Sequence, residues 1–224
     1  MVALPDRESI ESRILRALAK ANTQAQRRIT DALGNPPDVA NVSADVWAEV
    51  EALLRGAVVP ELESVYMAAA EAASAELGIG FAFDVVNTQA ATWARQYGYD
   101  LVRGINDNSR RMLQESIGAF FDTPMTNAQL QEKLGRIFGA SRAESISITE
   151  VTRAASEGER SAVADLANQG VRTVQVFQTS ADDRVCAICG PMDGKRSDET
   201  GFQWPPLHVR CRCGVRSEVV IPDG

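Results

Sequence analysis

The stretch Cys186-Ala-Ile-Cys189, followed after eighteen residues by His208-Val-Arg-Cys211-Arg-Cys213, decides how the end of this chain folds. In Cys-x-x-Cys a tight turn brings two thiolates to one tetrahedral ion at about 2.3 Å each, and His-x-x-Cys supplies a second chelating pair. All four cysteines lie in this stretch, whereas a secreted disulfide framework distributes them along the chain. The pattern therefore predicts a small knuckle that binds one structural zinc ion.

Five donors compete for the four positions around this ion. Cys186, Cys189 and His208 are predicted ligands, and either Cys211 or Cys213 is the fourth. Side chains two apart on a strand point to the same side, yet they sit wider than adjacent ligands around one ion prefer. We favour Cys211 and keep Cys213 as the alternative. A redox pair and a catalytic zinc are the competing interpretations of the cluster.

Three arginines close in sequence, Arg184, Arg210 and Arg212, are candidates to support the metal. Three thiolates and one neutral imidazole leave a net negative charge around a divalent ion, which a nearby guanidinium offsets. The hypothesis is that at least one of these arginines donates a hydrogen bond to a ligand sulfur. The alternative, that all three are solvated surface side chains, stays open.

Upstream of the motif, apolar residues recur every three or four positions and predict helices. The first runs over residues 6–33 and ends at Gly34. The second starts at the N-cap Ser43, and Pro60 marks a kink or break before its continuation over 62–77. A third begins near residue 84, and the sequence leaves its continuity past Gly104 open.

Further helix starts and two strands follow. Thr126 with Gln129, and Ser141 with Glu144, fit capping boxes, the second opening a helix over 142–168. After Gly170 the period changes, so that 171–177 and 215–221 read as strands. The predicted fold class is α+β, with a mainly α-helical N-terminal two-thirds and a small C-terminal β-rich zinc-knuckle module. The predicted domains are a helical region over 1–83, a second helical region over 84–170, and the strand and Cys/His module over 171–224.

Composition limits the functional classes. The 224 residues are 45% apolar and carry a formal net charge of −7, while residues 171–224 hold seven Lys/Arg and seven Asp/Glu. The excess of acid argues against broad phosphate binding, although a local arginine cluster remains compatible with it. No run of about 18 apolar residues and no secretory signal pattern occurs, so we expect no membrane contact and a protein that works in the cytosol of the cell that makes it.

The run from Val174 to Cys213 resembles the phage head-morphogenesis family, the Mu F-like minor head proteins of tailed bacteriophages. The resemblance rests on the aspartate-containing turn before Cys-x-x-Cys, the step Asp193-Gly194, and the ending Pro-Pro-Leu-His-x-x-Cys-Arg-Cys. The helix with Thr149-Glu150, Gly158 and Arg160 is similar to one that precedes the strand in that family. The resemblance covers about residues 126–220, and Val209 departs from it where many relatives have proline.

The resemblance implies a minor structural protein of the virion head, in few copies near the portal, used in capsid assembly, DNA packaging or delivery. Its implied partners are the portal protein, the major coat protein, or both, with weak contact to packaged DNA as a further expectation. We expect no enzymatic activity, and the resemblance implies a place in the virion head after synthesis in the host cytoplasm. Phe202 and Trp204 are expected to cover the metal or pack on the helices, and an exposed anchor for a partner is the alternative.

Two rival functions remain. A zinc nuclease needs a general base, and His208 is the only histidine, so binding of the metal leaves no imidazole for that role. Asp182 and Asp183 are the remaining candidates, more typical of caps or solvated groups in such a turn. A zinc-dependent DNA-binding module would use Arg210, Arg212 and Arg216, with steep salt dependence.

Overall fold

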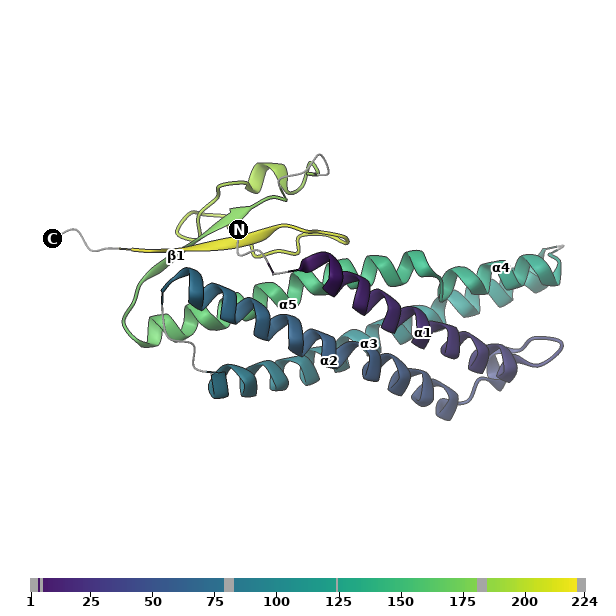
Figure 1. Ribbon diagram of the computed structural model, residues 1–224. Coiled ribbons are helices and arrows are strands. Elements are labelled where there is room, and N and C mark those ends of the chain that lie inside the picture. The colour runs from purple at the N-terminus through teal and green to yellow at the C-terminus, as the bar shows by residue number, and fades with distance from the viewer. Residues whose placement is uncertain (1–3, 5, 79–82, 124, 181–184, 221–224) are drawn as a thin grey trace. The chain divides into compact units, whose positions relative to one another are not determined.

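A computed structural model describes residues 4, 6–78, 83–123, 125–180 and 185–220, with the backbone alone at 83, 84 and 127. Its helices and strands follow one another along the chain as Figure 1 shows: α1 (Arg7–Leu33), α2 (Ala44–Glu76), α3 (Phe83–Asp122), α4 (Asn127–Ile137), α5 (Ala140–Asn168), β1 (Thr173–Gln178) and β2 (Gly214–Val219). Short 3-10 turns occupy Val39–Asn41 and Gly190–Met192. The predicted α+β class, mainly helical with a small C-terminal sheet, is confirmed.

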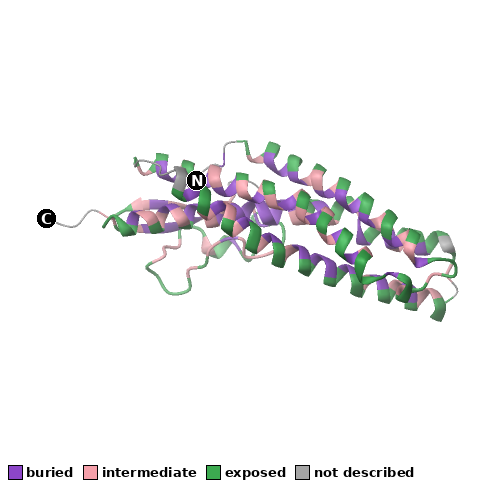
Figure 2. Ribbon diagram, turned by 90° about the horizontal axis from the view of Figure 1, so that it is seen from below, coloured by how far each residue is buried: buried purple, intermediate pink, exposed green. Residues whose placement is uncertain are grey.

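Each long helix forms because its apolar residues share one face. In α1 the side chains of Ile14, Leu18 and Ile29 are buried. Their spacings of four and eleven residues correspond to about one and three helical turns, so they share one face, and polar residues occupy the other. Figure 2 shows this alternation of buried and exposed residues along the helices. Gly34 ends α1 with a φ of 76°, a conformation that glycine adopts without strain. No described helix is both long enough and apolar enough to cross a membrane.

Two helices continue through positions where the sequence indicated or allowed an interruption. Of the two possibilities at Pro60, the break is wrong, because α2 runs from Ala44 to Glu76 with Pro60 inside it, and the kink stays a prediction. Buried Val58 and Leu62 flank the proline, and burial of such side chains outweighs one missing backbone hydrogen bond. The continuity of α3 past Gly104, which the sequence left open, holds over 40 residues.

The two predicted capping boxes had different outcomes. Thr126 caps α4, since its Oγ1 accepts from the Gln129 amide at 3.3 Å and the Gln129 side chain accepts from the Thr126 amide at 2.9 Å. The box at Ser141 was wrong, because α5 already begins at Ala140 and Ser141 lies inside its first turn. At the other end Gly170, with a φ of 81°, closes α5 as predicted.

The chain divides into two compact units made of segments distant in sequence. One unit combines residues 12–60 and 95–144. Within it Arg142 of α5 connects to α4 and α3. Its guanidinium donates to the carbonyl of Ile137 in α4 at 2.8 Å, and to the carbonyl of Ile105 at 3.1 Å and the hydroxyl of Ser109 at 3.0 Å in α3. The predicted division at residues 83 and 170 is a different partition, drawn from sequence, and stays a prediction.

The other unit combines residues 1–11, 61–94 and 145–224 and carries the cysteine cluster. Helix α5 approaches α2 closely at Gly158, where a Cβ would lie 2.2 Å from the Tyr66 carbonyl oxygen. Strands β1 and β2 pair antiparallel from Thr173–Val219 to Gln178–Gly214, and Figure 1 shows them side by side. The described strands confirm the two predicted near 171–177 and 215–221, with residue 221 outside the described part.

Candidate metal centre

The turn from Cys186 to Cys189 is built by backbone hydrogen bonds. The Gly190 amide donates to the Cys186 carbonyl at 2.9 Å, and the Cys189 amide donates to the Cys186 sulfur at 3.4 Å. The 3-10 turn Gly190–Met192 then leads the chain away. This geometry points both sulfurs to one side, as the Cys-x-x-Cys spacing predicts.

The motif Asp193-Gly194 returns the chain to β1. An oxygen of Asp193 accepts from the Thr179 amide at 2.8 Å and from its hydroxyl at 2.9 Å, and the Gly194 amide donates to the Phe177 carbonyl at 2.9 Å. Gly194 has a φ of 75°, which favours glycine at this position. The segment after it pairs with β1 through Val176 and Arg196 on the edge that β2 leaves free.

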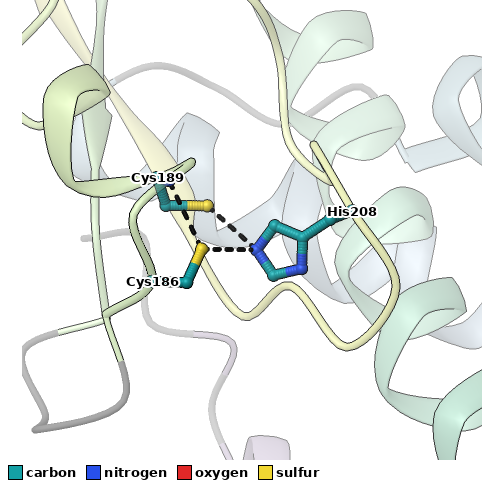
Figure 3. Close-up of side chains that lie close together, drawn as sticks. All are labelled: Cys186, Cys189 and His208. Atoms are coloured by element: carbon teal, nitrogen blue, oxygen red, sulfur yellow. Dashed lines mark hydrogen bonds between the residues drawn. The ribbon is translucent and has the colours of Figure 1, made fainter.

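His208 meets the first two cysteines. Its Nε2 lies 3.1 Å from the sulfur of Cys186 and 3.1 Å from that of Cys189, as Figure 3 shows. On the opposite side of the ring Nδ1 is 2.7 Å from the Val209 carbonyl oxygen, to which it donates. This bond raises the pKa of His208 and leaves the Nε2 lone pair directed at the sulfurs. The ring is therefore oriented as a metal ligand requires.

Cys211 and Cys213 complete the cluster from the other side. The sulfurs of Cys189 and Cys211 are 3.8 Å apart, and Cys213 lies within 4.8 Å of both. Cys186, Cys189 and His208 form a second group with atoms within the same limit, so Cys189 is shared. The structure thus brings together all five donors predicted from the sequence, and both candidates for the fourth ligand remain in reach.

Several separations within the donor set match those of ligands on one tetrahedral ion, although the described donors form two groups of three that share Cys189. Two thiolates bound to one zinc at about 2.3 Å lie about 3.8 Å apart, which equals the separation of Cys189 and Cys211. A sulfur and an imidazole nitrogen on such an ion lie about 3.5 Å apart, a few tenths of an ångström more than the 3.1 Å that separates His208 Nε2 from the sulfurs of Cys186 and Cys189. The cluster could hold one metal ion.

Thiol pKa values differ within the cluster. Burial raises the pKa of Cys189 to about 12. A hydrogen bond from Cys213 lowers the pKa of Cys211 to about 5, and the same bond, together with burial, raises that of Cys213. At Cys186 the Cys189 amide lowers the pKa. Cys211 is therefore the sulfur that most readily becomes a thiolate, with Cys213 as its proton-bearing neighbour.

An apolar shell covers the sulfurs. Phe177 of β1 is fully buried against Cys189, Cys211 and Cys213, and Met192, Phe202 and Leu207 pack around them. Such a shell excludes water and strengthens thiolate–metal bonds. Phe202 thus packs at the cluster, as expected.

Trp204 follows the same expectation by packing on a helix. Its ring meets Phe202 edge-on at 6.0 Å, and the Arg160 guanidinium of α5 stacks on it at 4.8 Å. A guanidinium over an indole is held by the negative face of the ring. Arg160, one of the residues that carry the family resemblance, therefore helps to hold the Cys/His module on α5.

Helix α5 holds the second ligand pair through two threonines that sequence reasoning did not single out for this role. Thr149 Oγ1 accepts from the Arg210 amide at 2.9 Å, and Thr152 Oγ1 donates to the Cys211 carbonyl. Arg210 has a φ of 64°, a conformation that costs a non-glycine residue about 1 kcal/mol and turns the chain between His208 and Cys211. The bond from Thr149 helps to offset that cost.

The proposed supporting arginines have other described partners. Arg210 Nε donates to Ser145 at 2.9 Å, and Arg212 pairs with Glu11 at 2.9 Å. Arg184 lies outside the described residues, as do Asp182 and Asp183. A bond from one of these arginines to a ligand sulfur stays a prediction.

The fold and the cluster together define a mainly helical protein whose C-terminal Cys/His module is seated on its last helix. Residues 123–216 match the family model described as Phage Mu protein F like protein. The match covers α4, α5, β1 and the cluster, and it confirms the resemblance to the Mu F-like phage head family over this part of the chain. No curated protein and no solved structure gave a significant match.

Proposed function

We propose that this chain is a minor phage head protein that acts in head morphogenesis near the portal, in capsid assembly, DNA packaging or delivery. The observation that carries the proposal is the family match over residues 123–216, which includes the complete Cys/His cluster. The proposed partners are the portal protein, the major coat protein, or both. The role is structural and does not require catalysis.

In this proposal one zinc ion clips the C-terminal module. Cys186, Cys189, His208 and Cys211 bind it, with Cys213 as the alternative to Cys211. The support is the 3.8 Å separation of the Cys189 and Cys211 sulfurs and the orientation of His208. Zinc supplies stability that a segment of about fifty residues with a two-stranded sheet lacks.

Nuclease activity has less support. Nε2 of His208 faces two sulfurs and Nδ1 donates to a carbonyl, so both nitrogens of the only histidine are engaged. Purified protein that cuts DNA with added divalent metal, and loses this activity on Asp182→Ala or Asp183→Ala, would favour the nuclease.

The location test uses assembled particles. Virions are purified, their protein content is measured by mass spectrometry, and density for the chain is sought by electron microscopy. We expect the chain in few copies, with density at the portal vertex or inner shell. Its absence from virions contradicts the proposed function.

A further inference from the structure

The solvent face of α1 carries an unusual concentration of positive charge. Arg13, Arg16, Lys20 and Arg27 are all exposed, and we call them the α1 basic row. Successive residues of a helix are about 100° apart, so these four lie within an arc of about 60°. At about 1.5 Å per residue the row extends over about 21 Å. It is a straight line of cations on one helix face.

This charge contrasts with the rest of the chain. Residues 12–30 contain five Lys/Arg and no Asp/Glu, and removing those five from the total of 23 leaves 18 Lys/Arg against 30 Asp/Glu. Such a segment keeps its positive potential although the whole protein is acidic. The net charge of the chain therefore does not reveal this positive segment.

Most of the row is not used for ion pairing inside the chain. Arg28, beside the row, pairs with Glu49 at 3.4 Å. In the part of the chain that the structure describes, Arg16, Lys20 and Arg27 make no ion pair. Three long cationic side chains thus project into solvent from one helix, all within one compact unit.

The residues between the cations indicate the chemistry of the partner. The other exposed side chains on this face are the uncharged Ser9, Ser12, Thr23 and Gln24, and the acidic Asp31 one turn beyond Arg27. Contacts to phosphate oxygens use Arg, Lys, Ser, Thr and Gln, whereas the centre of a protein interface is rich in aromatic residues and poor in charge. Residues 12–30 contain no aromatic residue on which an unpaired base could stack, which favours a duplex over a single strand.

We propose that the α1 basic row contacts the phosphate backbone of double-helical DNA without reading its sequence. The proposal deepens the head function, on which it rests for the presence of packaged DNA. It also relocates the DNA contact away from the knuckle. There Arg212 is held by Glu11 and Arg216 by Glu218, whereas the row is open to solvent.

The magnitude follows from counterion release. Three phosphate contacts give a slope of log K against log salt of about −2.7, so affinity falls about 40-fold between 50 and 200 mM salt. The test measures binding of the full chain to a mixed-sequence duplex of about 25 base pairs by fluorescence anisotropy across that range. The triple variant Arg16→Gln, Lys20→Gln, Arg27→Gln is expected to lose most of the affinity and the salt slope.

A charge-matched control separates the row from net charge. Arg103→Gln, Arg111→Gln, Arg136→Gln removes three exposed arginines of the same compact unit, and it is expected to bind duplex like the wild type. Circular dichroism melts confirm that both variants fold, because glutamine preserves the helix. Equal losses in the two variants, or wild-type binding that does not respond to the row substitutions, overturn the proposal.

Two further readouts complete the test. Wild-type protein that ignores duplex but self-associates through the row overturns the proposal in favour of an acidic face on a second copy. Incorporation into virions tests the head function separately from the DNA contact. Row variants that enter particles but bind no DNA are consistent with the proposed head function. A wild-type chain that binds duplex through the row yet is absent from virions contradicts the head function alone.

Discussion

Replacing Gly158 by alanine tests the close approach of α5 to α2 in the unit that carries the metal centre. The added Cβ would lie 2.2 Å from the Tyr66 carbonyl oxygen and 3.0 Å from the Cβ of Ala69, and Cβ atoms essentially never come within 3.0 Å of another heavy atom. The oxygen belongs to the backbone of α2, so no side-chain rotation removes the contact. One of the two helices has to shift.

The net effect is a difference of two opposed contributions. Alanine favours the helix over glycine by about 1 kcal/mol. Overpacking a closely packed contact costs about 1–3 kcal/mol, and a backbone contact this short belongs at or above the upper end. We expect Gly158→Ala to lower the free energy of unfolding by about 2 kcal/mol, which lowers Tm by roughly 4–8 °C for a chain of this size.

Gly104→Ala is the matched control, because a Cβ at Gly104 in α3 meets no atom within 4 Å. Only the helix preference remains there, so this variant is expected to gain about 0.5–1 kcal/mol. Scanning calorimetry and urea unfolding of the two variants measure both signs. A Gly158→Ala chain as stable as the wild type would show that α5 does not approach α2 this closely.

Three further predictions concern the metal centre and its surroundings. Metal analysis of the wild type should give about one zinc ion per chain. Cys211→Ser is expected to lose this ion and Cys213→Ser to keep it. The opposite result would make Cys213 the ligand in place of Cys211. Thr152→Val removes the hydroxyl that binds the Cys211 carbonyl and should cost about 1–2 kcal/mol in urea unfolding, so an unchanged midpoint contradicts that contact. Burial raises the pKa of Glu159 to about 8, so the unfolded chain releases this proton from about pH 4.5 while the folded chain keeps it, and stability falls as pH rises between those values. Glu159→Gln should reduce this loss of stability between about pH 5 and pH 8, measured as the change in Tm. An equal change of Tm in the variant and the wild type contradicts the raised pKa of Glu159.

Local patterns in the sequence predicted most elements because each pattern has one physical solution. The spacing of Ile14, Leu18 and Ile29 places them on one helix face whatever surrounds them, and Thr126 with Gln129 closes a cap within four residues. At Pro60 and Ser141 the local signals did not give the observed helix bounds. Burial around Pro60 and an earlier start of α5 are set by packing, which local signals do not report.

The candidate site divides in the same way. Cys186 and Cys189 meet through one turn, so their spacing alone predicts that they share an ion. The hold on the second ligand pair is not local, because Thr149 is 61 residues from Arg210 and Thr152 is 59 from Cys211. A threonine inside a helix gives no sign in the sequence of such a partner.

The N-terminal turn of α1 joins this arrangement through a part-buried charge cluster. Arg7 donates to the Arg212 carbonyl at 3.1 Å and to Thr152, while Glu11 accepts from Arg7 at 2.8 Å and from Arg212 at 2.9 Å. Burial alone would raise the pKa of Glu11, but the hydrogen bonds and charges of Arg212 and Arg7 outweigh it, so its pKa is lowered.

Glu11 is therefore ionised at neutral pH and pairs with the residue between Cys211 and Cys213. Removing one member of this part-buried charge pair leaves the other unpaired, which destabilises the unit. The first turn of α1 and the Cys/His module consequently stabilise each other within one unit. The Cys/His module therefore holds the first turn of α1, whose residues Arg7 and Glu11 belong to the same unit.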